Sequence, residues 1–242
     1  MKAVILAGGY ATRLYPLTLD RPKHLLEVGG RPILELLLER LPLDELDAVY
    51  VVTNAKFAER FRDWAESYRA DVIVLDDGTT SEDDRLGAIG DLQLVIESQG
   101  LDDDLIVAAG DSIFTARLDD FARFGRERGA AAIAVYDIGD LDEMKRLSSI
   151  VVDADSRLVA FEEKPERPES TLAGIALYFY PRTVLPLVGR YLAEGNNPDQ
   201  PGRLVAWLYE RVPVYAWRVP GRWFDIGTPE TLAEAEELFE TN

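Results

Sequence analysis

Two adjacent glycines and two of the cations in the first 23 residues form an arrangement suited to phosphate binding. An apolar segment ends in residues 6–9 (LAGG), and Arg13 and Lys23 follow it. Glycine lets the main chain approach a ligand and aim N–H groups at phosphate oxygens, and arginine adds a charged fork. The segment is not a Walker A loop, because no Gly-Lys-Ser/Thr follows it, and adjacent glycines do not match the GxGxxG dinucleotide turn. A structural turn with an incidental arginine is the alternative for this motif taken alone.

Two aspartates later in the chain have positions suited to binding a cation. Asp111 follows the apolar segment 105–109, and Asp225 lies in an aromatic-flanked segment before Gly227. Carboxylates and phosphate oxygens are the ligands that Mg²⁺ prefers in proteins. Each aspartate alone could instead cap a turn or begin a helix. The residue types therefore permit a Mg²⁺ site, provided that the two side chains meet in the fold.

A third candidate group is Glu163-Lys164, which precedes Pro165 near the end of an expected strand. Adjacent side chains leave a strand on opposite faces, so both can face one ligand only if the chain turns there. Such a turn would let the lysine hold a phosphate and the glutamate accept hydrogen bonds from hydroxyl groups. An ordinary ion pair at a strand end is the alternative.

The composition restricts the classes of protein to which the chain can belong. It has 242 residues, of which 47% are hydrophobic, a formal net charge of −18 and no cysteine. This length fits one large α/β domain or two small ones, and the missing cysteines exclude a disulfide scaffold and thiolate metal sites. No apolar run approaches the roughly 18 residues that span a bilayer, so a cytoplasmic protein is expected. An acidic surface repels nucleic acid and anionic membranes, so neither is an expected partner.

The acidity is uneven along the chain and has two explanations. Residues 1–31 carry five basic and two acidic side chains, a net charge of +3, which suits an anionic ligand. Elsewhere carboxylates dominate, which favours a halophilic protein because dense carboxylates keep a chain soluble while salt screens their repulsion. An acidic protein from an arginine-biased genome is the alternative.

Alternating elements place the candidate residues in an α/β fold. Strands are expected at 2–7, 48–53, 72–75, 105–109 and 130–136, with helices between them at 32–41, 56–69, 85–97 and 118–128. This alternation indicates βαβ units and a mainly parallel sheet, with sites at the carboxyl ends of its strands. Later strands at 149–153, 157–162, 173–180 and 213–219 indicate antiparallel additions. A surface loop is expected at 194–202, and a final helix from Pro229.

Several segments, in this order, resemble those of the sugar-phosphate nucleotidyltransferases, typified by glucose-1-phosphate thymidylyltransferase. They are 6–18 (LAGGYATRLYPLT), 21–33 (RPKHLLEVGGRPI), 85–88 (RLGA), 110–112 (GDS), 161–165 (FEEKP), 173–180 (AGIALYFY) and 223–229 (WFDIGTP). The resemblance implies a Rossmann-like nucleotide-diphospho-sugar transferase fold, with a mixed, mainly parallel central sheet flanked by helices. It also implies a single domain, 1–242, with a nucleotide-binding half at about 1–135 and a sugar-phosphate-binding half at about 136–242. Many relatives carry a C-terminal β-helix, and we expect a short form without one.

The resemblance implies an enzyme that transfers a nucleotidyl group from an NTP to a sugar 1-phosphate and releases pyrophosphate. The expected pair is dTTP or UTP with glucose 1-phosphate, the expected cofactor is Mg²⁺, and the expected state is a monomer or small homo-oligomer. Both substrates are polyanions, so catalysis depends on positioning and on stabilising charge. A nucleotidyltransferase for a non-sugar phosphate and a non-catalytic regulatory homologue are the alternatives.

The same resemblance assigns roles to particular residues. Arg13 and Lys23 match the catalytic cations beside the phosphates, and Asp111 and Asp225 match the metal ligands. The residues that match nucleotide-binding positions are Leu6, Ala7, Gly8, Gly9, Arg13, Lys23 and Gly87. Those that match sugar-phosphate-binding positions are Glu163, Lys164 and Gly174.

The chain departs from the family pattern at a few positions. Ala11 stands where glycine is usual, a change expected to cost little room, and Ser112 and Ser149 replace an asparagine and a glycine. The loop 76–84, where the base is expected to be read, is longer than in the thymidylyltransferases. His24, the only histidine, is expected to be a bystander, because the attacking phosphate oxygen is already an anion.

Overall fold

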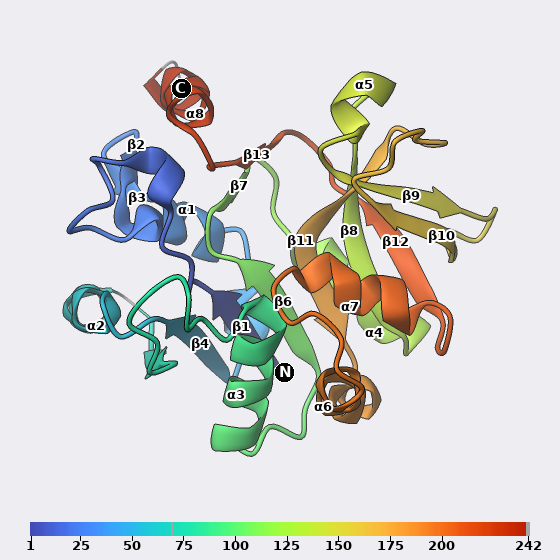
Figure 1. The fold of residues 1–242 in the computed structure, drawn as a ribbon, viewed down its shortest axis with the longest axis horizontal. Helices are drawn as coiled ribbons and strands as arrows, with labels where there is room; N and C mark the ends of the chain where they lie inside the picture. The colour runs from blue at the N-terminus through green and yellow to red at the C-terminus, as the bar shows by residue number, and fades with distance from the viewer. Residues whose placement is uncertain (69, 241–242) are drawn as a thin grey trace.

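A nine-stranded mixed sheet forms the centre of the computed structural model, which describes residues 1–68 and 70–240 (Figure 1). Its strands are β1 (Lys2–Leu6), β4 (Ala48–Thr53), β5 (Val72–Asp76), β6 (Leu105–Ala109), β8 (Ala131–Asp137), β9 (Ser148–Val152), β10 (Leu158–Glu163), β11 (Leu172–Tyr180) and β12 (Val214–Arg218). Seven of them lie in the order β10-β9-β11-β6-β1-β4-β5, and β8 and β12 continue from β11. The expected mixed, mainly parallel sheet is confirmed.

The direction of the strands changes between β6 and β11. β1 pairs in parallel with both β4 and β6, and β4 pairs in parallel with β5. β11 runs antiparallel to β6, β8 and β9, and so joins the first half of the chain to the second. The carboxyl ends of β1 and β6 therefore lie next to the point where the strand direction reverses. Ligands of α/β sheets bind at such a reversal.

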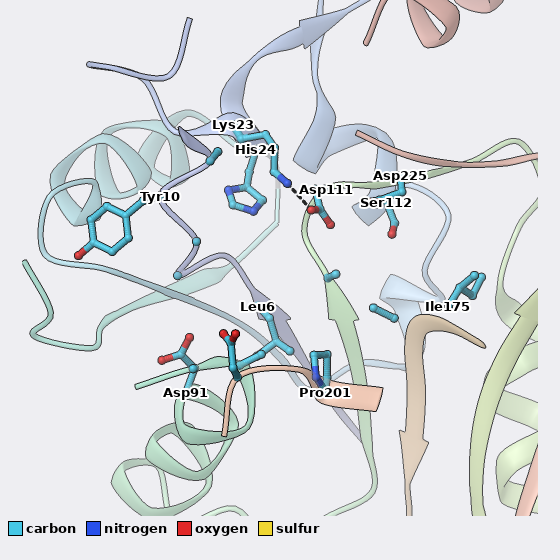
Figure 2. Close-up of a pocket in the computed structure, with 18 of the residues that line it drawn as sticks. Leu6, Tyr10, Lys23, His24, Asp91, Asp111, Ser112, Ile175, Pro201 and Asp225 are labelled. Atoms are coloured by element: carbon cyan, nitrogen blue, oxygen red, sulfur yellow. Dashed lines mark hydrogen bonds and ion pairs between the residues drawn. The ribbon is translucent and has the colours of Figure 1, made fainter. Parts of the chain in front are cut away.

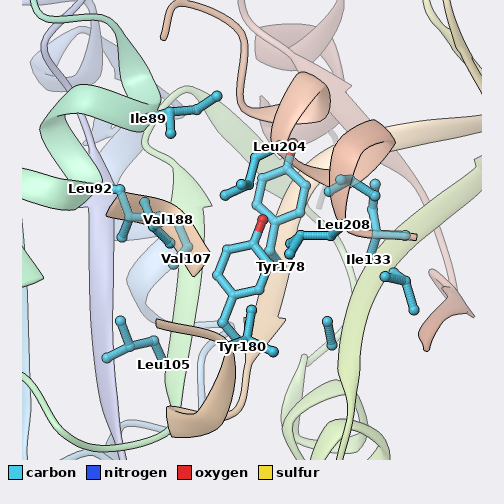
Figure 3. Close-up of a cluster of buried hydrophobic side chains, with 14 of the residues drawn as sticks. Ile89, Leu92, Leu105, Val107, Ile133, Tyr178, Tyr180, Val188, Leu204 and Leu208 are labelled. Carbon is cyan, nitrogen blue, oxygen red and sulfur yellow. The ribbon is translucent and has the colours of Figure 1, made fainter. Parts of the chain in front are cut away.

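Helices cover both faces of the sheet (Figure 1). Apolar side chains of α3 (Ala88–Ser98), α6 (Leu185–Ala193) and α7 (Pro201–Leu208) pack on one face, and those of α1 (Ile33–Leu38), α2 (Ala58–Ser67) and α4 (Asp119–Arg128) pack on the other. Figure 3 shows Tyr178 and Tyr180 within the first of these cores, and their rings stack 5.8 Å apart because alternate residues of a strand share a face. Burial of apolar side chains on both faces fixes the register of the strands.

Two short ribbons and a C-terminal helix lie beside the main sheet. One ribbon joins β2 (Glu27–Val28) to β3 (Arg31–Pro32), and the other joins β7 (Ser112–Phe114) to β13 (Trp223–Asp225). In the second ribbon Asp225 pairs with Ser112, so two segments far apart in the sequence lie side by side. α8 (Pro229–Glu240) completes a small third core with residues of these ribbons.

The elements agree with the sequence-based expectations apart from several differences. The helix expected at 85–97 begins only at Ala88, because Gly87 has a φ of 80° and does not continue a helix. The loop expected at 194–202 is wrong at its end, since Pro201 begins α7, and neither α6 nor α7 was expected. The helix expected to reach Arg69 ends at Ser67, and Arg69 lies outside the described residues. Among the described residues, no helix has the length and apolar character needed to cross a membrane.

Candidate active site

A cavity of about 460 Å³ lies where β1 and β6 end, and residues of both halves of the chain line it. Of the residues selected from the sequence, those that line it are Leu6, Gly8, Gly9, Arg13, Lys23, Gly87, Asp111, Glu163, Gly174 and Asp225. Ala7 is buried behind the loop, where its carbonyl accepts a hydrogen bond from Thr53, and it does not line the cavity. Lys164 is exposed and also does not line the cavity.

The glycine loop after β1 has two different constraints. A Cβ on Gly9 would meet no atom within 4 Å, so this residue leaves the main chain open to a ligand. A Cβ on Gly8 would lie 2.5 Å from the carboxylate of Asp91, so a larger residue here would have to displace this buried side chain. Ala11 has a φ of 51°, and the left-handed region costs an alanine roughly 1–2 kcal/mol. The effect of alanine at position 11 is therefore strain in the main chain and not crowding of the loop.

Lys23, Asp111 and Asp225 come together at one end of the cavity. The Nζ atom of Lys23 donates to Asp111 Oδ2, and these side chains are 12% and 19% exposed. Asp225 is opposite Ser112 in the β7–β13 ribbon, which brings its carboxylate to the same place. Burial and the Asp111 charge raise the pKa of Asp225 to about 6. Burial disfavours the charged form of Asp111, yet Lys23 holds the pKa of this carboxyl below its usual value.

Arg13 reaches the same end of the cavity. A Cβ on Gly227 would lie 3.4 Å from Arg13 Nη2 and 3.7 Å from Asp225 Oδ2, so the guanidinium and the carboxylate are near neighbours. His24 also lies here, but burial and the Lys23 charge lower its pKa to about 4, which leaves the imidazole neutral at pH 7. Two permanent cations and two carboxylates therefore surround this end, with no charged histidine among them.

The cavity carries more negative than positive charge, although its proposed ligands are anions. Its lining includes the cations Arg13, Lys23, Arg85 and Arg146 and the carboxylates Asp77, Glu82, Asp91, Asp111, Glu163, Asp199 and Asp225. A polyanion can enter such a site only with added positive charge. No cluster of three or more histidine, aspartate or glutamate side chains that could hold a metal occurs in the described residues. The Asp111–Asp225 pair nevertheless fits Mg²⁺, which takes one or two carboxylates and completes its shell with water and substrate phosphate.

A different set of side chains lines the end of the cavity near β9 and β10. Glu163 pairs with Ser148 across these strands, and the Ser148 hydroxyl donates to Glu163 Oε2. The chain turns at Lys164, which has a φ of 50° and whose N–H donates to Leu147 O at 2.9 Å, but only Glu163 of the two residues lines the cavity. Arg146, which the sequence reading missed, lines the cavity beside Leu147. The register of β9 against β10 places residue 146 next to the Glu163-Lys164 turn, and no spacing in the sequence indicates this register.

Two glycines in the cavity wall are held by close packing. A Cβ on Gly174 would lie 2.8 Å from Ile150 Cδ1, so this strand position has no space for a side chain. A Cβ on Gly87 would lie 2.7 Å from the main-chain carbonyl of Pro198, and the positive φ adds a second constraint. Gly87 is therefore required by the fold itself, whereas a side chain at position 174 would have to displace the ends of the Ile150 and Ile133 side chains.

A buried pair of carboxyl groups, Asp77 and Asp91, is the other feature missed from the sequence. Both lie against Gly8, and Figure 2 shows Asp91 beside Leu6 and well apart from Lys23 and Asp111. Burial and the Asp77 charge raise the pKa of Asp91 to about 8, so the pair holds one proton at neutral pH. A loop and a helix supply the two residues, and nothing in their sequence spacing indicates that they meet.

The shared proton predicts a pH dependence of stability. The folded protein keeps a proton at Asp91 that the unfolded chain loses above pH 3.8, so the free energy of unfolding should fall as the pH rises from there to about 8. Asp91→Asn should flatten this fall, and its melting temperature relative to the natural protein should increase with pH. Melting curves over this pH range test the prediction, with Asp76→Asn on the neighbouring exposed residue as control. Parallel profiles for the natural protein and Asp91→Asn would show that the pair holds no proton.

Comparisons with known proteins bear on the family. The sequence profile of the family described as nucleotidyl transferase matches residues 2–242. A UTP–glucose-1-phosphate uridylyltransferase, AglF, of Haloferax volcanii is 29% identical over 238 residues, which cover 98% of this chain and 96% of that protein. The bifunctional protein GlmU of Methanocaldococcus jannaschii is 26% identical over 238 residues, and a mannose-1-phosphate guanyltransferase of Candida albicans is 28% identical over 248. These matches cover 98% and 100% of this chain but 54% and 65% of the two relatives, so the chain spans about half to two-thirds of their length.

A solved structure gives the same answer for the fold. A UDP-glucose pyrophosphorylase complexed with UDP-glucose superposes with a TM-score of 0.84 and 18% identity, over 99% of this chain and 98% of that one. At this identity the likeness speaks for the fold alone. The match of the family profile to residues 2–242 carries the assignment, and it agrees with the resemblance of the sequence segments. The chain belongs to the nucleotidyl transferase family.

Proposed function

We propose that this protein transfers a nucleotidyl group from an NTP to a sugar 1-phosphate and releases pyrophosphate. The observation that carries the proposal is the meeting of Arg13, Lys23, Asp111 and Asp225 at one end of a cavity whose other end holds Glu163. Two cations beside two carboxylates that can hold a metal ion suit phosphates, and a glutamate suits hydroxyl groups. The uridylyltransferase and the guanyltransferase among the relatives act on glucose 1-phosphate and mannose 1-phosphate, according to their names.

The proposed reaction is an in-line displacement at the α-phosphorus. A phosphate oxygen of the acceptor forms the new P–O bond, and the bond to the bridging oxygen breaks, so that pyrophosphate leaves with the electron pair. Lys23 stabilises the charge that develops at the α-phosphate, and Arg13 holds the β- and γ-phosphates. The nucleophile is an anion, so no base is required, which agrees with a neutral His24.

Mg²⁺ is the proposed cofactor, with Asp111 and Asp225 as the residues that would hold it. When bound, the ion supplies the positive charge that the cavity lining lacks. Lys23 donates to Asp111 Oδ2, so the carboxylate that would hold the ion would also keep the lysine beside the reacting phosphate. Leu6, Gly8, Gly9 and Gly87 would form the nucleotide-binding wall, backed by the buried Ala7.

The two halves of the chain have different proposed tasks. Residues from about 1–135 would bind the nucleotide and those from about 136–242 the sugar phosphate, with Asp225 returning to the metal through the β7–β13 ribbon. Both proposed substrates are cytoplasmic metabolites, so we place the reaction in the cytoplasm, catalysed by a monomer or a small homo-oligomer. A non-catalytic homologue would lack one of the charged residues of the site, and this chain retains all four.

A turnover screen tests the proposed function. Each common NTP is combined with a panel of sugar 1-phosphates, phosphocholine and an alditol phosphate, in the presence of Mg²⁺, and pyrophosphate release is measured. We expect release with at least one sugar 1-phosphate and a requirement for Mg²⁺. Release only with a non-sugar phosphate would support the first alternative, and no release from any pair would support a regulatory homologue.

The acceptor end of the cavity gives a prediction with a matched control. Arg146 lines the cavity just before β9, and Lys164 follows Glu163 at the end of β10, so we propose that both hold the acceptor phosphate, Lys164 by turning its exposed side chain toward the cavity. Lys164→Ala and Arg146→Ala should each raise the acceptor KM about tenfold, because each removes one charge-assisted contact worth roughly 1.4 kcal/mol, and should leave the NTP KM unchanged. Lys145→Ala removes a neighbouring cation that pairs with Asp142 outside the cavity, and is the control.

Steady-state titration of each substrate separates the possible outcomes. If Lys164→Ala behaves like the control while Arg146→Ala does not, the arginine alone holds the acceptor phosphate. If both variants weaken NTP and acceptor equally, the fold is distorted and neither contact is supported.

The net charge of −18 predicts a dependence on salt. Repulsion among surface carboxylates destabilises the compact state, and at molar salt the Debye length falls to about 3 Å, which screens it. We therefore propose a halophilic protein whose melting temperature rises from low to molar KCl. A melting temperature that stays constant or falls over this range would contradict the proposal and leave an arginine-biased genome as the explanation.

A further inference from the structure

A row of three residues crosses neighbouring strands at the end of the cavity where the acceptor is proposed to bind. Ser148 on β9 pairs with Glu163 on β10 and with Gly174 on β11, and all three residues line the cavity. The cavity continues beside this row as a pocket of about 180 Å³, which the same three residues also line. Residues paired directly across strands share a face of the sheet, so Ser148 is the central residue of the wall that faces the proposed acceptor.

The single proton of the Ser148 hydroxyl is committed to Glu163. Ser148 Oγ donates to Glu163 Oε2, and the reverse direction is not possible because a carboxylate has no proton to donate. A Cβ on Gly202, in the first turn of α7, would lie 3.4 Å from Ser148 Oγ and 3.5 Å from Glu163 Oε2, so this turn lies directly against the pair. Only the lone pairs of Ser148 Oγ therefore remain for a ligand.

The Ser148–Glu163 pair offers two neighbouring acceptors to the cavity. Ser148 occupies Glu163 Oε2, which leaves Oε1 of the same carboxylate and the serine oxygen to accept from a ligand. Gly174 adds no side chain to the row, so a flat ligand can lie across it. Two adjacent acceptors match two adjacent donors, and hydroxyl groups on neighbouring ring carbons of a sugar are such a pair.

We propose that Ser148 determines acceptor specificity by binding a second sugar hydroxyl beside the one that Glu163 binds, an inference that rests on the nucleotidyl transfer proposed above. The acceptor is then a sugar 1-phosphate with hydroxyls on two adjacent ring carbons that face this wall. An acceptor without one of these hydroxyls leaves an oxygen of the pair without a partner in the closed site. Sites built to hydrogen-bond a substrate hydroxyl reject analogues that lack it.

The next residue, Ser149, has the same side chain in a different environment. It is 5% exposed, its hydroxyl donates to Ser170 O at 3.2 Å, and it does not line the cavity. Successive residues of a strand face opposite sides of the sheet, so only one of the two serines can face the acceptor. The sequence resemblance draws attention to Ser149, whereas the structure places the hydroxyl of Ser148 in the cavity wall. Ser149 therefore provides a matched control on the same strand.

A series of deoxy sugars tests the inference on the full chain. The probes are glucose 1-phosphate and mannose 1-phosphate, each with its 2-, 3-, 4- and 6-deoxy forms, in the presence of Mg²⁺. Isothermal titration calorimetry gives their Kd values, and pyrophosphate release with each common NTP gives their KM values. For the natural protein we expect losses of about tenfold or more at two adjacent ring positions and smaller losses elsewhere. In Ser148→Ala one of these two losses should disappear and the other should remain, because Glu163 is still present.

Three further variants make the result specific. Ser149→Ala removes the hydroxyl on the other face of β9 and should keep both losses. Ser148→Thr retains a hydroxyl on a side chain that suits a strand, and should also keep both losses. Ser148→Gly removes the hydroxyl in a second way and should behave like Ser148→Ala. Melting curves establish that each variant is folded, and the NTP KM should be the same in all of them, since the substitutions lie at the acceptor end.

Several outcomes would overturn the inference. It fails if neither sugar 1-phosphate binds, if no two adjacent deoxy positions share the loss, or if Ser148→Ala keeps both losses. It also fails if Ser148→Ala weakens every compound of a series by the same factor, because Ser148 would then only support Glu163. The two proposals can be told apart. Transfer to a sugar 1-phosphate with Ser148→Ala behaving like Ser149→Ala would contradict only the inference, and the expected pattern of Kd values without pyrophosphate release from any NTP would contradict only the proposed function.

Discussion

Replacing Asp111 with asparagine should lower kcat by about a thousandfold, because the proposed metal ion stabilises charge that develops at the reacting phosphates. The substitution keeps the shape of the side chain and removes the charge that would hold the ion. In this variant Asp225 still places a carboxylate near the Lys23 ammonium, so the lysine keeps one neighbouring negative charge. The fold should therefore persist. The measurements are kcat, the Mg²⁺ concentration that gives half-maximal rate, and the melting temperature.

Asp120→Asn provides the control for this experiment, since Asp120 is an exposed residue of α4 that pairs with Arg123. We expect Asp111→Asn to need more Mg²⁺ and the control to need the same amount as the natural protein. A variant of Asp111 that keeps its rate and its Mg²⁺ requirement would remove this residue from the metal site, whatever its distance from Asp225.

Lys23→Ala should lower kcat by about a thousandfold, since the charge that this lysine stabilises develops mainly in the transition state. Lys23 is 12% exposed and donates to Asp111, so its ammonium is held in place before any substrate arrives. Preorganised charge of this kind costs no reorganisation during the reaction. Steady-state kinetics with each substrate varied separately gives the effect on kcat and on both KM values.

Lys56→Ala, on an exposed lysine that lies over the Phe57 ring, is the matched control. If Lys23→Ala changed only a KM value, the lysine would contribute to ground-state binding and its role at the α-phosphate would be wrong. Because Lys23 and Asp111 contact each other, the double variant should lose much less than the product of the two single losses.

The sequence was a good guide to residues that follow strands. Leu6 ends β1 and Asp111 lies just beyond β6, and parallel neighbouring strands bring such positions to the same edge of the sheet. Periodicity and apolar runs identify those strands, so their carboxyl ends could be located without a structure. The mixed sheet and its helical layers were predicted for the same reason.

Residues whose position depends on pairing between distant segments could not be placed in this way. Asp225 reaches Asp111 through the short β7–β13 ribbon, and its three-residue strands carry no periodic signal. Arg146 enters the cavity through the register of β9 against β10, and Asp91 meets Asp77 through the packing of a helix against a loop. Each placement depends on tertiary contacts, which spacing along the chain does not encode.

The role of β11 in joining the halves has a consequence for synthesis of the protein. β6 (Leu105–Ala109) leaves the ribosome long before its neighbour β11 (Leu172–Tyr180), so a nascent chain of about 135 residues has an apolar strand with one unpaired edge. Such edges pair readily with other chains. The half proposed to bind the nucleotide is therefore not a unit of folding, and a translation stop between residues 135 and 172 should release an aggregation-prone fragment.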